Sequence, residues 1–88
     1  MHWKKNFQLK EIQETLNTHG YKTGPIKDIS IVDRNRSERV NTLKFTGRGG
    51  EELLISGKDL REFMGPNVLK SNNYEITMKG YYVDFLRE

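Results

Sequence analysis

The sequence predicts an α+β domain, with two short helices packed on a small, mainly antiparallel sheet of about five strands. Apolar residues recur at helical spacing in two segments and alternate with polar residues in the others, which is typical of helices and strands respectively. The predicted strands follow one another through short turns, without the crossover helices that parallel strands need. With 88 residues, of which 34% are apolar, the chain has room for one domain with a modest core.

The first helix is expected over residues 7–18, where most of the apolar residues fall on one face. Asn6 is its expected N-cap, and Gly20, which tolerates the left-handed conformation, is its expected C-terminal stop. The apolar residues of this helix are Phe7, Leu9, Ile12 and Leu16.

A three-stranded meander is expected next, over residues 26–34, 39–46 and 52–55. The first of these segments is rich in β-branched residues, which have poor helix propensity. In the second segment, Leu43 and Phe45 are expected to face the core, and a glycine-rich turn leads from it to the third.

The second helix is expected to begin at Ser56, whose hydroxyl can cap the backbone while Asp59 reaches back from the first turn. Gly65 ends this helix. A hairpin over residues 74–78 and 81–86 follows it. The expected order is therefore helix, three strands, helix, two strands.

Composition excludes several classes of function. The absence of cysteine rules out disulfides, thiolate zinc sites and cysteine nucleophiles. The two histidines, His2 and His19, show no carboxylate spacing of a recognisable metal site. The carboxylates fall on faces predicted to be exposed, without the apolar setting that a general acid needs. The residues therefore predict a non-catalytic domain with no metal or cofactor, and no apolar stretch approaches the roughly 20 residues of a membrane span.

An arginine-rich turn joins the first two strands of the meander. Arg34, Arg36 and Arg39 lie within six residues, in a chain whose formal net charge is +3. Together with Arg61 and Lys70, if these lie nearby, the arginines can bind phosphate or carboxylate groups. The alternative is a solvated turn whose charges discourage the pairing of strand edges. The residues alone leave both interpretations open.

The aromatic residues allow a further interpretation. Tyr74, Tyr81 and Tyr82 can act as stacking platforms beside the same arginines, which would make the domain a small nucleic-acid-binding module. Aromatic side chains of this kind, Trp3 among them, can also stack on sugars or complete a small core. Salt dependence separates these functions, because phosphate contacts weaken steeply as salt rises.

Four short motifs stand in a fixed order along nearly the whole chain. The first combines Trp3 with Leu9-x-x-Ile12-x-x-x-Leu16 and Gly20, and the second is Ile29-x-Ile31-x-x-Arg34-x-x-Ser37-x-Arg39-Val40. The third is Ile55-x-Gly57-x-x-x-Arg61-x-x-x-Gly65, and the fourth is Leu69-Lys70-Ser71-x-x-Tyr74. In this order and spacing they resemble the stage II sporulation protein D and amidase-enhancer family.

The resemblance implies a bacterial cell-wall protein that works outside the cytoplasmic membrane, in the cell wall or forespore intermembrane space of a spore-forming bacterium. Sporulation members of the family are lytic transglycosylases, which cleave peptidoglycan glycan strands already stripped of stem peptides and leave an anhydro sugar. They act in engulfment of the forespore beside an amidase, so glycan strands and a cell-wall amidase are the implied partners.

Two hallmarks of the family are missing from this sequence. It has neither the E-M-P-like segment that carries the family's catalytic glutamate nor the later G-H-G-x-G-M-S-Q type motif. We therefore expect residues 1–88 to form a single non-catalytic domain from the interior of a larger cell-wall protein, with an accessory or substrate-binding role. The matched polar positions give the candidate glycan- or partner-binding residues: Arg34, Ser37, Arg39, Arg61, Lys70, Ser71 and Tyr74.

One residue inside the matching region departs from the family pattern. Glu38 stands where the family usually has glycine, between Ser37 and Arg39. Glycine there would permit a positive φ, whereas glutamate either bears a cost of about 1 kcal/mol or selects another turn type. The hairpin is expected to survive with a changed tip.

Overall fold

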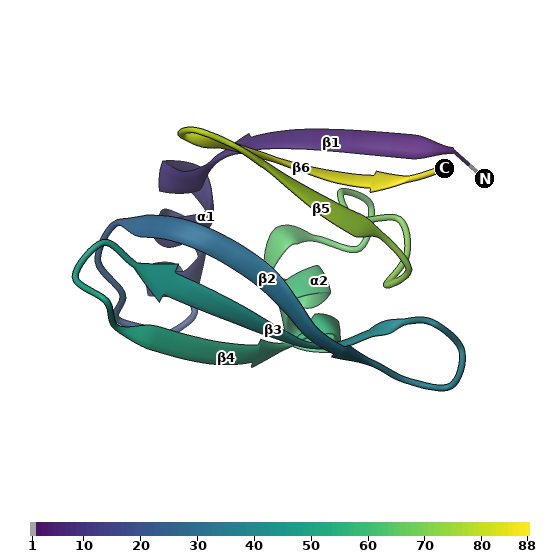
Figure 1. The fold of residues 1–88 in the computed structure, drawn as a ribbon, viewed down its shortest axis with the longest axis horizontal. Helices are drawn as coiled ribbons and strands as arrows, with labels where there is room; N and C mark the ends of the chain where they lie inside the picture. Colours follow the sequence, from purple (N-terminus) through teal and green to yellow (C-terminus); the bar gives the residue numbers. More distant parts are fainter. Residues whose placement is uncertain (1) are drawn as a thin grey trace.

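The computed structural model describes residues 2–88 and has two helices and six strands (Figure 1). The elements are β1 (Trp3–Gln8), α1 (Leu9–Thr18), β2 (Ile26–Arg34), β3 (Val40–Gly47), β4 (Glu52–Ser56), α2 (Gly57–Met64), β5 (Glu75–Lys79) and β6 (Tyr82–Arg87). The predicted α+β class is confirmed. The strands form two three-stranded antiparallel sheets, however, with the orders β1-β6-β5 and β2-β3-β4, so there is one strand more than the sequence indicated.

The first strand corrects the predicted start of the first helix. Residues 3–8 pair antiparallel with β6, and α1 begins at Leu9, so the expected helix start at Phe7 and the expected N-cap at Asn6 are wrong. Phe7 lies opposite Val83, and its ring packs edge-on against that of Phe85, with centroids 5.6 Å apart. These sheet contacts bury Phe7, so tertiary packing overrides the helical pattern here.

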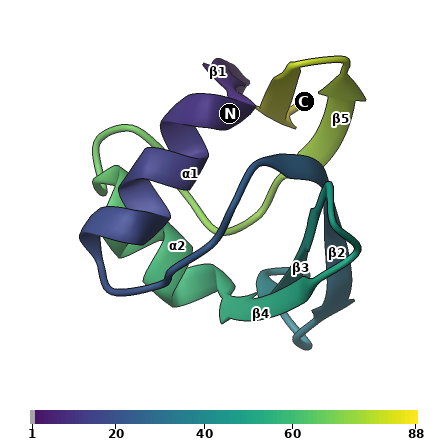
Figure 2. The same ribbon diagram turned by 90° about the vertical axis from the view of Figure 1, so that its left-hand side faces the viewer.

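The β2-β3-β4 sheet is the predicted meander. Leu43 lies opposite Ile55 and Phe45 opposite Ile29, so these four buried side chains share one face of the sheet. Figure 2 shows both helices on the same side of this sheet. The opposite face carries polar side chains such as Lys44 and has no helix over it among residues 2–88.

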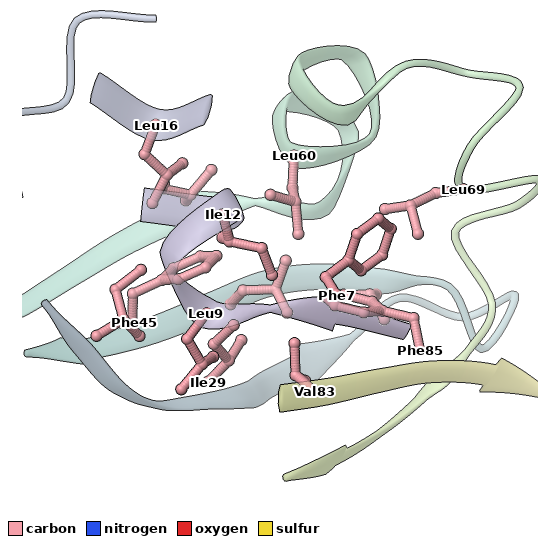
Figure 3. Packing of buried hydrophobic residues seen from close by; sticks show 14 of the residues in the cluster. Phe7, Leu9, Ile12, Leu16, Ile29, Phe45, Leu60, Leu69, Val83 and Phe85 are labelled. Atoms are coloured by element: carbon pink, nitrogen blue, oxygen red, sulfur yellow. The ribbon is translucent and has the colours of Figure 1, made fainter. Parts of the chain in front are cut away.

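The core lies between the two helices and the two sheets (Figure 3). The helices contribute Leu9, Ile12 and Leu16 from α1 and Leu60 from α2. The strands and the segment before β5 contribute the other buried apolar residues, which are Phe7, Ile26, Ile29, Val40, Leu43, Phe45, Ile55, Leu69, Tyr74, Val83 and Phe85. A single cluster therefore links all the elements into one folding unit.

The junction of β4 and α2 has the Ser56 half of the predicted cap. The hydroxyl of Ser56 accepts a hydrogen bond of 3.0 Å from the backbone N–H of Asp59, which satisfies one of the free donors of the first helical turn. Gly57 follows because a Cβ at that position would collide with the carbonyl oxygen of Val40. This close approach packs the start of α2 against the start of β3.

The molecule is elongated, with principal extents of 35 × 22 × 20 Å. The turn of residues 35–39 and the chain termini lie at one end of the long axis, and the β5-β6 turn lies at the other (Figure 1). Within residues 2–88, neither helix has the length and apolar character that crossing a bilayer requires.

Candidate ligand-binding site beside the β2-β3 turn

A cavity of about 260 Å³ lies at the terminal end of the molecule. It is lined by Trp3, Ser37, Arg39, Ser71, Asn73 and Arg87. Three of these residues, namely Ser37, Arg39 and Ser71, belong to the set that the sequence indicated. Ser37 and Arg39 lie more than 30 positions before Ser71 in the sequence. The fold brings the two segments together at this cavity.

The turn that carries Ser37 and Arg39 is organised by Asn35. The side-chain oxygen of Asn35 accepts hydrogen bonds from the backbone N–H groups of Ser37 (2.9 Å) and Arg39 (3.1 Å). The N–H of Asn35 in turn donates to the carbonyl oxygen of Arg39 (2.9 Å). An asparagine side chain that accepts from its own turn is a common way to fix such a loop. Ser37 and Arg39 are thus presented on an ordered turn.

Glu38 adopts a backbone conformation that favours glycine. Its φ is 64°, which makes it the one non-glycine residue with positive φ in the described part of the chain. The sequence left two outcomes open here, a strained positive φ or another turn type. The structure has the strained positive φ.

Arg34 binds backbone atoms of its own chain. One terminal nitrogen donates to the carbonyl oxygen of Glu38 (2.9 Å), and the other donates to the carbonyl oxygen of Tyr74 (2.7 Å) and to a carboxylate oxygen of Glu75 (2.9 Å). The guanidinium therefore joins the arginine-rich turn to the start of β5. It fixes one wall of the cavity relative to the other and does not line the cavity.

Arg61 plays the same part in the next loop. Its Nε donates to the carbonyl oxygen of Leu69 (2.7 Å), and a terminal nitrogen donates to those of Pro66 and Lys70 (3.3 Å each). The planar fork of arginine suits several acceptors at once, which lysine cannot reproduce. Arg61 thereby shapes the segment that leads to Ser71, while the exposed Lys70 lies outside the cavity lining.

The segment between Leu69 and β5 is fixed by two further contacts. The backbone N–H of Val40 donates to the carbonyl oxygen of Asn72 (2.7 Å), which ties the segment to the start of β3. The hydroxyl of Ser71 accepts from the backbone N–H of Asn73 (3.1 Å). Ser71 and Asn73 thus face the arginine-rich turn from a segment that is itself anchored.

Tyr74 lies in the core, with only 1% of its surface exposed. Its ring packs edge-on against those of Trp3 (6.1 Å between centroids) and Phe85 (5.2 Å). Burial raises the pKa of the Tyr74 phenol above its usual range, while the positive charge of Arg34 acts in the opposite direction. A side chain in this place supports Trp3 from behind and offers no open face for stacking.

Three buried polar atoms near this site have no hydrogen-bond partner among residues 2–88: Trp3 Nε1, Asn72 Oδ1 and the Tyr74 hydroxyl. A buried polar atom without a partner is uncommon and costs about 1–3 kcal/mol. Trp3, which lines the cavity, thus carries an unused donor.

Three lining residues are outside the candidate set: Trp3, which stood in the first motif, and Asn73 and Arg87, which the sequence did not single out. Arg87 lies opposite Trp3 in the β1-β6 pair, so the two side chains meet only because residues 3–8 form a strand. The sequence interpretation assigned no strand there and could not place Arg87. Asn73 gave no signal beyond its position next to the Leu69-Lys70-Ser71 motif.

The buried carboxylate of the fold lies elsewhere, on the outer face of the β1-β6-β5 sheet. Asp84 is 2% exposed; it receives hydrogen bonds from Lys79 Nζ and Asn6 Nδ2 (2.8 Å each), and Lys4 Nζ lies 3.5 Å away. The bonds from Lys79 and Asn6 lower the pKa of Asp84 to about 2. In the described residues, no group of three or more acidic, histidine or cysteine side chains is placed to hold a metal ion.

No family model matches the sequence, and no curated protein matches it.

Proposed function

We propose that this domain binds peptidoglycan glycan strands at the cavity beside the β2-β3 turn, as an accessory or substrate-binding part of a stage II sporulation protein D-like lytic transglycosylase. In this proposal the parent protein acts in sporulation and cell-wall remodelling, outside the cytoplasmic membrane. The observation that carries the proposal is the cavity itself, because Ser37, Arg39 and Ser71, which the family motifs singled out, line it together with an indole.

The chemistry of the lining suits a sugar. An aromatic face can pack against the apolar face of a sugar ring, while hydroxyl, amide and guanidinium groups can hydrogen-bond its hydroxyls and N-acetyl groups. Trp3 supplies the aromatic group, and Ser37, Ser71, Asn73 and Arg39 supply the polar groups.

Arg34 and Arg61 act here as positioning residues. The guanidinium group of each donates hydrogen bonds to backbone carbonyl oxygens, and each arginine thereby fixes a segment that carries a lining residue. A binding site gains affinity when its groups are held in place before the ligand arrives. These two arginines supply that rigidity without touching the glycan.

The domain binds in this proposal and does not cleave. A general acid needs a pKa near the working pH, and the buried carboxylate Asp84 has its pKa lowered to about 2. The glutamate that the resemblance implies for catalysis belongs to a segment that this sequence does not contain. The amidase partner likewise follows from the resemblance and is tested separately, by mixing the domain with the cognate amidase.

The test is a titration of the ¹⁵N-labelled domain with denuded glycan oligomers at about millimolar concentration, followed by two-dimensional NMR. We expect shifts at the backbone amides of Ser37, Arg39 and Ser71. The indole N–H of Trp3, a single resolved signal, should move with them.

Matched variants make the titration specific to this site. Arg39→Ala removes a lining side chain, and Arg36→Ala removes an arginine from the same turn that does not line the cavity. We expect Arg39→Ala to weaken binding by about tenfold or more and Arg36→Ala to leave it unchanged, because a lost charged hydrogen bond is worth about 1.5–3 kcal/mol. Unmoved Trp3 and Ser71 signals at saturating glycan, or equal effects of both variants, would overturn the proposal.

A further inference from the structure

A second cavity, of about 410 Å³, lies at the opposite end of the long axis, beside the β5-β6 turn. Four apolar residues form much of its wall, namely Leu9, Pro25, Ile26 and Tyr81. Neither the arginine-rich turn nor any residue of the proposed glycan site contributes to it.

Backbone and side-chain hydrogen bonds tie the walls of this cavity together. The N–H of Leu9 donates to the carbonyl oxygen of Tyr81 (2.8 Å), which joins the start of α1 to the β5-β6 turn. The N–H of Arg48 donates to the carbonyl oxygen of Pro25 (2.9 Å), which joins the β3-β4 turn to the start of β2. A cavity whose walls are fixed in this way is preformed, as ligand sites generally are.

The two charged residues that line the cavity are both positive. Lys10 and Arg48 line it, no acidic residue does, and neither cation takes part in an ion pair within residues 2–88. Three acidic residues adjoin the lining: Glu11 and Glu14 on α1, each next in sequence to a lining residue, and Glu51, whose side chain lies against the β3-β4 turn. All three are exposed, and none forms an ion pair with Lys10 or Arg48.

The start of α1 adds to this positive potential. Gln8 is the N-cap residue and makes no side-chain cap. The N–H of Leu9 is taken by the carbonyl oxygen of Tyr81, so the next N–H groups of the first turn, from Lys10 and Glu11, are the ones without a capping side chain. Free N–H groups at a helix N-terminus favour an anion.

The rim of the cavity is aromatic and exposed. Tyr81 is 71% exposed and its neighbour Tyr82 45%. The guanidinium carbon of Arg48 lies 5.1 Å from the centre of the Tyr81 ring, within the range of a cation–π contact. Tyrosine and arginine, like tryptophan, are enriched at the energetic centres of protein interfaces.

We propose that this second cavity docks an acidic segment of a partner protein. One apolar side chain of that segment fills the space between Leu9, Ile26 and Tyr81, and neighbouring carboxylates meet Lys10 and Arg48. A protein segment fits better than a small carboxylate, because the exposed tyrosines extend the apolar surface beyond the cavity. The proposal does not rest on glycan binding at the terminal end.

The test uses three capped hexapeptides of the form Glu-Asp-Leu-X-Asp-Glu, in which X is leucine, phenylalanine or tryptophan. Each has a neutral counterpart in which glutamine and asparagine replace the acids. Titrated into the ¹⁵N-labelled domain, at least one acidic peptide should shift the amides of Leu9, Lys10, Ile26 and Arg48. Its neutral counterpart should bind about fivefold or more weakly, since two charge pairs are lost.

Variants check the assignment of the cavity. Arg48→Ser and Tyr81→Ser should each weaken the acidic peptide by about fivefold or more, whereas Arg36→Ser, at the other end, should not. Wild-type-like spectra of the variants establish that they are folded. No shifts with any peptide at about 5 mM, equal binding of acidic and neutral peptides, or binding of benzoate as tight as that of the peptides would each overturn the proposal. Glycan titration reports on Trp3 and Ser71, so the two proposals fail independently.

Discussion

At the scale of the residue, Glu38 shows how the arginine-rich turn holds a non-glycine residue at positive φ. A residue with a Cβ in the left-handed region costs about 1–2 kcal/mol, and Glu38 has a φ of 64°. The carbonyl oxygen of Glu38 accepts from Arg34, and Asn35 binds the N–H groups on either side. These hydrogen bonds hold the backbone in a conformation that the side chain disfavours.

Replacing Glu38 with glycine should therefore stabilise the domain. The substitution removes a backbone strain of about 1–2 kcal/mol from the folded state. The greater freedom of glycine in the unfolded chain lowers the free energy of unfolding by about 0.5–1 kcal/mol. We expect a net gain of about 0.5–1 kcal/mol, seen as a rise in Tm of about 2–8 °C by calorimetry. Glu38→Ala is the control: it removes the same carboxylate but keeps the strained φ, so a similar gain in that variant would contradict the explanation.

At the scale of the element, Asp84 connects all three strands of its sheet. It lies on the central strand β6, and it binds Asn6 of β1 on one side and Lys79 of β5 on the other. Lys4 of β1 covers the same carboxylate. A buried carboxylate with these partners is stabilised as the anion, which is why its pKa falls.

This arrangement predicts a pH dependence of stability. The pKa of Asp84 is about 2 in the folded protein, against 3.8 for an ordinary aspartate, so its anion contributes stability above about pH 4. That contribution is lost as pH falls from about 4 to about 2. We expect Asp84→Asn to lower the urea midpoint most at neutral pH, with the difference from wild type narrowing below pH 4.

The matched control for this pH series is Glu62→Gln, which alters an exposed carboxylate of α2. Its urea midpoint should stay near the wild-type value at each pH. A gap between Asp84→Asn and wild type that persists unchanged down to pH 2 would show that Asp84 contributes through packing and not through its charge.

The sequence predicted some elements well because their signals are local. The bounds of β2 agree with the predicted segment, and the Ser56 cap of α2 lies where the sequence indicated. The strand β1 was missed because Phe7 fits the helical pattern of Leu9, Ile12 and Leu16. Only its pairing with β6, near the other end of the chain, places Phe7 in a strand. Pairing over that distance leaves no signal in either segment alone.

Only part of the candidate site could likewise be predicted from the sequence. Ser37, Arg39 and Ser71 stand in short motifs and line one cavity, whereas Arg87 joins them only through the β1-β6 register. Arginine also looks the same in sequence whether it binds a ligand or a backbone carbonyl. The positioning part played by Arg34 therefore needed the fold to reveal it.

At the scale of the whole molecule, the distribution of charge and aromatic groups bears on nucleic-acid binding. Such binding would need cations and stacking platforms along one path. Tyr74 is buried, and Tyr81 and Tyr82 adjoin the β5-β6 turn, at the opposite end of the long axis from the arginine-rich turn. Arg34 donates to backbone carbonyls and to Glu75, which leaves its charge paired.

This separation predicts that the domain binds single-stranded nucleic acid only weakly. Because the exposed tyrosines and the arginine-rich turn lie at opposite ends of the molecule, a fluorescent oligothymidine should bind with a Kd weaker than about 10⁻⁴ M at physiological salt. Fluorescence anisotropy between about 50 and 200 mM salt measures it, and glycan binding over the same range should change little because sugar hydroxyls release no counterions. Micromolar affinity for the oligonucleotide, falling steeply with salt and lost in an Arg36→Ala/Arg39→Ala double variant, would instead identify the arginine-rich turn as a phosphate-binding surface.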